Sequence, residues 1–218
     1  MIVSAAPFAS LDLSFVNVTT LIPVVAYILG SIPFGLLVVK AFGGADIRSV
    51  GSGNIGAANV TRNAGPIAGA LTLLLDAGKG YLAVWIAGHW TGWNIRWIML
   101  GAIFAVIGHV FPVWLQFQGG KGVATGLGVF IPICWQAVVA AVVLWFLVVV
   151  FWRYSSLGSI AAAAAMPVLV YVLYAPGHAP PEFVNLGTIL IAVLILFKHR
   201  SNIERLIAGE EPRLKFRK

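Results

Sequence analysis

A short glycine-rich loop that carries one lysine is the segment of this sequence best suited to bind an anion. It reads Gly119-Gly120-Lys121-Gly122 and follows an apolar segment that ends at Phe111-Pro112. Glycines adopt positive φ, so successive backbone N–H groups can turn toward one oxyanion, and the lysine adds a mobile positive charge. A helix that begins near Val123 would direct its positive end at the bound group.

The loop does not have the spacing of a nucleotide-binding P-loop. Neither Gly120-Lys121 nor Gly78-Lys79 is preceded by a glycine at the required distance, and no Ser or Thr follows either lysine. We therefore exclude nucleotide binding. A flexible turn between two membrane helices is the alternative that this segment alone leaves open.

A second polar segment, residues 46–62, places Gly-Ser-Gly-Asn between two arginines. Arg48 and Arg62 are suited to clamp a phosphate through paired N–H donors, and Ser52 and Asn54 would add neutral hydrogen bonds. An ordinary cytoplasmic loop also contains basic residues, but it does not require small polar residues between them. The pattern favours phosphate binding.

Two further polar segments follow later in the chain. His199, Asn202 and Glu204 lie together at a predicted helix end, where a histidine can act as a base or as a phosphate donor near neutral pH. Ser155 and Ser156 lie in a polar turn and are suited either to cap a helix or to donate to a phosphate.

These loops interrupt a chain with the composition of a membrane protein. Its 218 residues are 60% hydrophobic and 10% charged, with a mean hydropathy of +0.96. This composition predicts an all-α integral membrane protein and excludes an ordinary soluble domain. A span needs about 20 apolar residues. We predict one domain over residues 1–218 with seven transmembrane helices, at about 21–40, 65–86, 97–115, 123–132, 135–152, 160–173 and 186–198.

The uncharged run between Lys121 and Arg153 decides the topology, because it is long for one span and short for two. Residues 131–135, which include Pro132, predict a break and turn. Two spans here place Lys121, Arg153 and the basic C-terminal segment on one face, opposite Arg96. The positive-inside rule favours this arrangement, with the N-terminus outside and the C-terminus in the cytoplasm. The net charge of +7 is then a topological signal and does not indicate nucleic-acid binding.

Three features lie inside the predicted spans. Residues 30–35 contain glycine and proline and predict a bend in the first span. Asp76 and Lys79 lie three residues apart on one helix face, where charges are expensive unless they are paired, so we expect an internal ion pair. Cys134 has no cysteine partner and is expected to be a small buried side chain.

The order of these motifs resembles that of the bacterial acyl-phosphate:glycerol-3-phosphate acyltransferases, the PlsY family. Residues 48–57 are similar to the first family motif, residues 108–125 to the second and residues 198–211 to the third. Residues 76–80 and 153–156 also follow the family pattern, and no motif position departs from it. The resemblance covers nearly the whole chain.

This resemblance implies an enzyme of the bacterial cytoplasmic (inner) membrane whose active site faces the cytoplasm. It would transfer a fatty acyl group from acyl phosphate to the 1-hydroxyl of sn-glycerol 3-phosphate, forming lysophosphatidate and inorganic phosphate, without a cofactor or a metal. Its partners would be these two substrates and membrane lipid, and we expect it to function as a monomer.

The resemblance also implies a role for individual residues. The catalytic residues would be Arg48, Ser52, His199 and Asn202. The acyl phosphate would bind at Gly119, Gly120 and Gly122, and glycerol 3-phosphate at Arg48, Lys121, His199 and Asn202. Supporting residues would be Ser31, Asn54, Ser155, Ser156 and Glu204. We expect Arg48→Ala and His199→Ala to abolish turnover in folded protein, and Glu204→Ala to lower the yield of folded protein.

Two other classes of membrane protein share some of these sequence features. A transporter or channel for a phosphorylated metabolite would also use broken helices and basic loops, but here the basic residues cluster on one face. A CDP-alcohol phosphotransferase would carry several spaced aspartates for metal, whereas this chain has only Asp12, Asp46 and Asp76. For the acyltransferase we expect direct attack by the alcohol, without an acyl-enzyme on Ser31 or Ser52.

Overall fold

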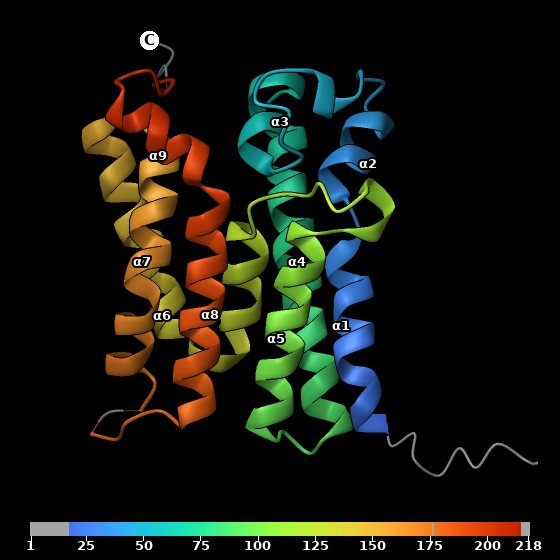
Figure 1. The fold of residues 1–218 in the computed structure, drawn as a ribbon, viewed down its shortest axis with the longest axis vertical. Coiled ribbons are helices and arrows are strands. Elements are labelled where there is room, and N and C mark those ends of the chain that lie inside the picture. Colours follow the sequence, from blue (N-terminus) through green and yellow to red (C-terminus); the bar gives the residue numbers. More distant parts are fainter. Residues whose placement is uncertain (1–17, 176, 215–218) are drawn as a thin grey trace, which may run out of the picture.

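The computed structural model describes residues 18–175 and 177–214, and this part of the chain consists of helices and loops without a β-strand (Figure 1). Five helical stretches are long and apolar enough to cross a membrane: Val18–Ala41, α4 (Pro66–Trp90), Ile95–Leu115, α6 (Val123–Trp152) and α7 (Ser155–Leu173). A sixth is formed if α8 (Glu182–Lys198) and α9 (Arg200–Ile207), which meet at an angle of 56°, count as one broken span. The all-α membrane fold is therefore confirmed.

The first stretch is interrupted where the glycine and proline pattern predicts a bend. A 3₁₀ turn (η2, Val18–Leu21) leads into α1 (Ile22–Ser31), and α2 (Phe34–Ala41) begins after Ile32 and Pro33. The Lys79 side chain donates a hydrogen bond of 2.7 Å to the carbonyl oxygen of Ile32. A buried lysine thus satisfies a backbone group that the break leaves without a helical partner.

Helix α6 reverses direction at the predicted break. Cys134 has non-helical φ and ψ angles of −157° and 79°, two residues after Pro132. A straight helix of 30 residues would be about 45 Å long. Its two ends nevertheless bind the same C-terminal segment: Lys121, just before α6, bonds to Asn202, and the carbonyl of Arg153, just after it, accepts from Leu214 N at 2.7 Å. The residues on the two sides of Cys134 therefore form two arms that return to one end of the molecule (Figure 1).

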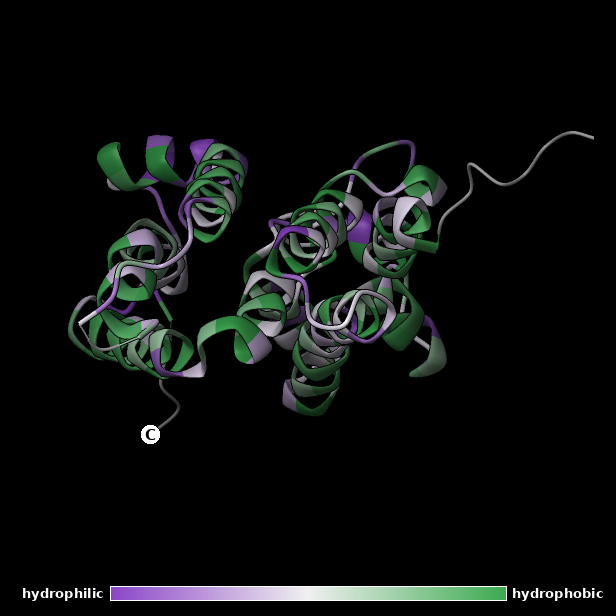
Figure 2. Ribbon diagram, turned by 90° about the horizontal axis from the view of Figure 1, so that it is seen from below, coloured by the Kyte–Doolittle hydropathy of each residue, from purple (hydrophilic) through white to green (hydrophobic). Residues whose placement is uncertain are grey.

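The helices lie in two groups side by side (Figure 2). Helices α1 to α5 pack on one another as the first group, and α6 connects α4 to the second group, which contains α7, α8 and α9. In the first group, α1 packs on α4 and α5 (Ile95–Val110), and α3 (Ala57–Ala64) packs on α4. Helices α4 and α5 also contact α6, and α5 contacts α8. Glycines permit close packing between helices: a Cβ on Gly30 would lie 2.0 Å from the oxygen of Ala105, and one on Gly128 1.9 Å from that of Ala77. Large apolar side chains such as Phe146, Phe151 and Leu190 cover the outside, as expected for a surface in lipid.

Two predictions about buried residues are confirmed. Lys79 Nζ lies 2.8 Å from Asp76 Oδ1, and both side chains are only 2% exposed. Cys134 is buried at the α6 kink. Several helices begin or end a few residues from the predicted limits. Helix α7 begins at Ser155 and α8 at Glu182, because polar and acidic residues are favoured in the first turn of a helix and extend it beyond the apolar core.

Candidate active site

A polar pocket opens at the end of the molecule where α3 and α9 lie (Figure 1). Its volume is about 220 Å³. Its lining comes from the loop before α3, from the loop before α6 and from the junction of α8 and α9: Ser52, Asn54, Lys121, Lys198, Arg200, Ser201 and Arg205. Four of these seven side chains are basic and the other three are neutral hydrogen-bonding groups. Such a lining favours an anion with several oxygen atoms, such as a phosphate ester.

Lys121 is held in this pocket by a chain of polar contacts from α9. Its Nζ donates to Asn202 Oδ1, and Asn202 Nδ2 donates to Glu211 Oε1 at 2.7 Å. Arg205 Nε in turn donates to the second oxygen of Glu211 at 2.8 Å. The Asn202 amide is therefore fixed with its oxygen toward the lysine and its nitrogen toward the glutamate. The predicted proximity of Lys121 and Asn202 is found.

The position of Lys121 also changes its acidity. Burial lowers the pKa of Lys121 to about 8, and the attraction of Glu211 opposes this shift only in part. The positive charges of Arg205, Arg62 and Lys198 act in the same direction as burial. The ammonium group therefore carries its charge near neutral pH but loses it in mildly alkaline solution.

His199 lies at the junction of α8 and α9 and is 2% exposed. Its Nδ1 is 2.8 Å from the carbonyl oxygen of Ile195. A carbonyl can only accept, so Nδ1 must carry the hydrogen. In the neutral ring, Nε2 is then left as an acceptor, which is the form that can take a proton from an alcohol.

Asn59 organises the loop that carries Ser52 and Asn54. It is 2% exposed, and its Nδ2 donates to the carbonyl oxygens of Ile47, Val50 and Asn54 at 2.9 to 3.2 Å. Its Oδ1 accepts from Ser52 N at 3.0 Å. A single buried amide thus closes the loop, and the small residues between the arginines permit the tight turns that this closure needs.

The glycine loop is bound to α5. The N–H groups of Gly119 and Gly120 donate to the carbonyls of Val110 and His109, both at 3.1 Å, so these two amides are not directed at an anion. A Cβ on Gly119 would lie 2.2 Å from the carbonyl oxygen of His109, and one on Gly120 2.0 Å from Nε2 of the same histidine. These two positions therefore require glycine for close packing on α5. The sequence predicted instead that their backbone N–H groups would bind an anion.

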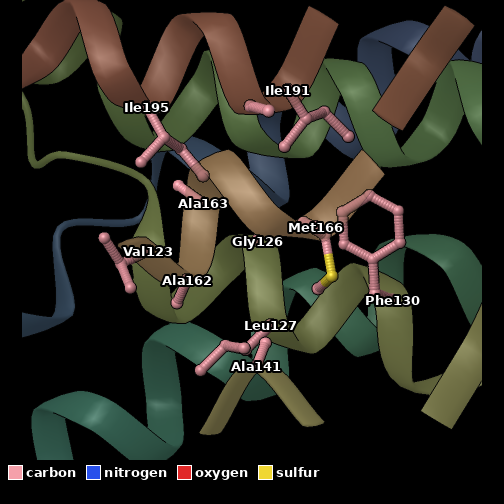
Figure 3. Close-up of a pocket in the computed structure, with 11 residues that line it drawn as sticks. Val123, Gly126, Leu127, Phe130, Ala141, Ala162, Ala163, Met166, Ile191 and Ile195 are labelled. Carbon is pink, nitrogen blue, oxygen red and sulfur yellow. The ribbon is translucent and has the colours of Figure 1, made fainter. Parts of the chain in front are cut away.

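Gly122 lies in the chain between a residue of the polar pocket and a residue of a small apolar cavity of about 30 Å³. It caps α6 with a φ of +87°, which favours glycine. One residue before it, Lys121 lines the polar pocket, and one residue after it, Val123 lines the cavity. The cavity lies between both arms of α6, α7 and α8, with side chains such as Phe130, Ala163 and Met166 pointing into it (Figure 3). Apolar side chains line this cavity, whereas basic and neutral polar side chains line the polar pocket.

Other predicted site residues lie outside the pocket lining. Arg48 is exposed and bonds to Asp46 through two guanidinium nitrogens, and these hydrogen bonds lower the pKa of Asp46 to about 2. Ser31 is buried at the end of α1, where its Oγ accepts from Trp114 Nε1 at 2.8 Å. Ser155 and Ser156 begin α7, and Ser156 is 7% exposed.

The role expected of Glu204 is carried by another glutamate. Glu204 is exposed on α9, and within the described residues its carboxylate makes no hydrogen bond or ion pair, whereas Glu211 is the residue that ties Asn202 and Arg205 together. Sequence reasoning also missed Lys198, Arg200, Ser201 and Arg205 as pocket residues. The signal for the three basic residues is their charge beside His199, which the pattern attributes only to topology, and Ser201 carries no such signal.

Comparison with known proteins agrees with this geometry. Residues 20–209 match the family model described as glycerol-3-phosphate acyltransferase. The chain is 47% identical over 191 residues to a glycerol-3-phosphate acyltransferase of Mesorhizobium japonicum, covering 88% of this chain and 93% of that protein. It is 49% identical over 197 residues to one of Gluconobacter oxydans, covering 89% and 92%.

Two solved structures are also similar. Both are crystal structures of PlsY (YgiH), an integral membrane glycerol 3-phosphate acyltransferase. The glycerol 3-phosphate form has a TM-score of 0.84 and 37% identity, and the lysophosphatidic acid form has 0.82 and 36%. Each match covers 91% of this chain and 96% of the other. Among the described residues, no group of three or more His, Cys, Asp and Glu side chains is placed to hold a metal ion.

Proposed function

The chain belongs to the glycerol-3-phosphate acyltransferase family, and from this premise we propose that it takes its acyl group from acyl phosphate and places it on the 1-hydroxyl of sn-glycerol 3-phosphate. The products would be lysophosphatidate and inorganic phosphate. Membership of this family supports the acylation of glycerol 3-phosphate in phospholipid synthesis. The identity of the donor and the position of the acylated hydroxyl belong to the proposal.

The observation that carries the proposal is that Lys121 lines the basic pocket while Val123, two residues later, lines the apolar cavity. An acyl phosphate has a charged head and an apolar tail joined at the reacting carbonyl. With its head at Lys121 and its tail beside Val123, the carbonyl would lie at the boundary of the two spaces. A water-soluble phosphate ester would enter the same pocket from the solvent side, where Arg200 and Arg205 provide positive charge.

The proposed reaction needs alignment and charge neutralisation more than chemical activation. The acyl phosphate is already activated, so the enzyme must bring the hydroxyl to the carbonyl and exclude water. Lys121 and the pocket arginines would balance the charge on the two phosphates. The hydroxyl proton would pass to His199 Nε2 or to a phosphate oxygen of a substrate, and the C–O bond to the leaving phosphate would break without an acyl-enzyme.

We also propose the orientation predicted from charge: seven spans in the bacterial inner membrane, with the polar pocket facing the cytoplasm and one chain as the functional unit. The reversal of α6 at Cys134 supports the two-span interpretation of that helix. With the reversal, Lys121, Arg153 and the C-terminal segment share one end of the molecule, as the positive-inside rule requires.

The test is phosphate release by purified protein given palmitoyl phosphate and glycerol 3-phosphate in the presence of a chelator, with palmitoyl-CoA in a parallel reaction. We expect phosphate and lysophosphatidate only when acyl phosphate and glycerol 3-phosphate are both present, and no product from the thioester. Product from palmitoyl-CoA alone would reassign the donor. Lack of product from either donor, in protein shown to be folded, would contradict the proposed transfer.

A further inference from the structure

The buried charges beneath the pocket form a cluster of three residues. Asp76 Oδ1 lies 2.8 Å from Lys79 Nζ and 3.5 Å from His109 Nδ1, and each of the three side chains is at most 3% exposed. Asp76 Oδ1 and His109 Nδ1 have no hydrogen bond with another group in the described part of the chain. Charges at this depth are costly and mark function more often than stability.

One side of the cluster contacts the loop that carries Lys121. His109 lies at the end of α5, its carbonyl accepts from Gly120 N, and its Nε2 leaves no room for a Cβ on Gly120. On α4, Gly80 packs so closely on the first turn of α6 that a Cβ there would lie 2.4 Å from the carbonyl oxygen of Thr125. The glycine loop therefore rests on α4 and α5 beside the cluster, and movement of His109 would displace Gly120 and with it Lys121.

The other side of the cluster contacts the loop that carries Ser52 and Asn54. Lys79 donates to the Ile32 carbonyl in the break between α1 and α2, and its ammonium lies 5.7 Å from the ring centre of Phe34 in α2. Gly35, the next residue of α2, lies so close to Ile55 that a Cβ on it would be 1.7 Å from the Ile55 carbonyl oxygen. The contacts that begin at Lys79 therefore reach Ile55, the residue that follows Asn54.

We propose that Asp76, Lys79 and His109 are positioning residues that set the distance between the two walls of the polar pocket. Lys79 holds the wall formed by Ser52 and Asn54, His109 holds the wall formed by Lys121, and Asp76 joins them. The proposal rests on the proposed function, since the distance between these walls matters for two substrates that must meet with small positional error. A misplacement of about 1 Å can cost roughly 100-fold in rate.

The first experiment removes the charge of the cluster while keeping its volume. The double variant Asp76→Asn/Lys79→Met replaces a buried ion pair with neutral side chains of similar size, which usually preserves folding. We expect a monodisperse, folded protein whose thermal midpoint falls because the Ile32 carbonyl loses its hydrogen bond from Lys79, and whose kcat/KM for glycerol 3-phosphate falls about 10- to 100-fold. Unchanged kcat and KM in this folded variant would overturn the proposal, because they would make the ion pair purely structural.

The second experiment measures the walls directly and does not depend on activity. Spin labels at Ala58→Cys and Gln118→Cys, both exposed and outside the pocket lining, report the distance between the two loops in a Cys134→Ala background. We expect a narrow distance distribution in the parent and a broader or displaced one after Asp76→Asn/Lys79→Met. An identical distribution would refute the proposal even if the parent lacked acyltransfer activity, so failure of the proposed function can be told apart from failure of this inference.

A matched variant covers the case in which the double variant does not fold. His109→Asn replaces the imidazole with an amide whose N–H can still donate toward Asp76, and it removes the ring atoms that a Cβ on Gly120 would meet. Gly120→Ala alone should lose at least about 10-fold in kcat/KM, and adding His109→Asn should recover part of the loss, because the two residues contact each other. Strict additivity of the two losses would contradict the coupling between the cluster and the loop.

Discussion

Lys121 combines a buried position with a positive charge, and this combination makes the site sensitive to pH. Burial lowers the pKa of Lys121 to about 8, so the ammonium is present below this pH and is lost as the pH rises through it. We expect kcat/KM for the acyl phosphate, whose head is proposed to lie at Lys121, to fall up to about tenfold per pH unit above pH 8. The measurement is initial rate against pH at low substrate concentration. Lys121→Arg keeps its charge in this range and should move the decline to higher pH, whereas a flat parent profile up to pH 10 would contradict the assignment.

Glu211 and Glu204 provide a matched pair for the polar network of α9. The Glu211 carboxylate lies beyond the end of α9, is 7% exposed and accepts from Asn202 and Arg205, whereas Glu204 is exposed on α9. We expect Glu211→Ala to destabilise the fold by about 1.5–3 kcal/mol, the contribution of hydrogen bonds to a charged group, and to lower the thermal midpoint in detergent. Glu204→Ala should change the free energy of unfolding by less than about 0.5 kcal/mol. Equal midpoints would show that the network does not stabilise the protein.

Single residues were predictable from the sequence where their partners lie nearby in the chain. Asp76 and Lys79 are three apart on one helix, so their pairing followed from helical geometry. His109 joins them from another helix, and Glu211 reaches Asn202 from beyond the end of α9. Both contacts depend on packing between segments, which leaves no local pattern. Arg48 was assigned to the site by its motif, but Asp46, two residues away, holds its guanidinium outside the pocket lining.

Helices α6, α7 and α8 enclose the apolar cavity and so provide a test of where the acyl tail binds. Ala163 on α7 points into the cavity (Figure 3), and the neighbouring Ala164 is exposed on the same helix. Ala163→Leu should displace about two methylene groups of the tail at about 0.8 kcal/mol each, which lowers kcat/KM for palmitoyl phosphate about tenfold relative to lauroyl phosphate. Ala164→Leu should leave this ratio unchanged. An unaltered preference in a folded Ala163→Leu protein would place the tail elsewhere.

The helix breaks were predictable because proline leaves a local signature in the sequence. The interruption before α2 and the reversal within α6 both lie at prolines, which lack the N–H group that a helix interior uses. Pro167 lies inside α7 without a break, so the signature marks candidate positions and packing decides the outcome. Helix limits were less predictable, since they depend on capping and on contacts with other helices. The two arms of α6 illustrate the difference: Pro132 predicts a break, but only packing of the first arm on α4 and of the second arm on α7 makes it a reversal.

The orientation of the whole molecule is the remaining prediction, and the reversal of α6 makes it testable with single cysteines in a Cys134→Ala background. Gln118 and Glu210 lie at the end with the polar pocket, and Glu182 lies at the start of α8 near the opposite end; all three are exposed. If the polar pocket faces the cytoplasm, a membrane-impermeant thiol reagent should label Glu182→Cys in intact cells and Gln118→Cys or Glu210→Cys only after the membrane is opened. Labelling of Gln118→Cys and Glu210→Cys from opposite sides would exclude the two-arm arrangement of α6, since both residues flank segments that bind each other. Labelling of both from outside would keep the fold but invert it, and the pocket could not then receive a cytoplasmic phosphate ester.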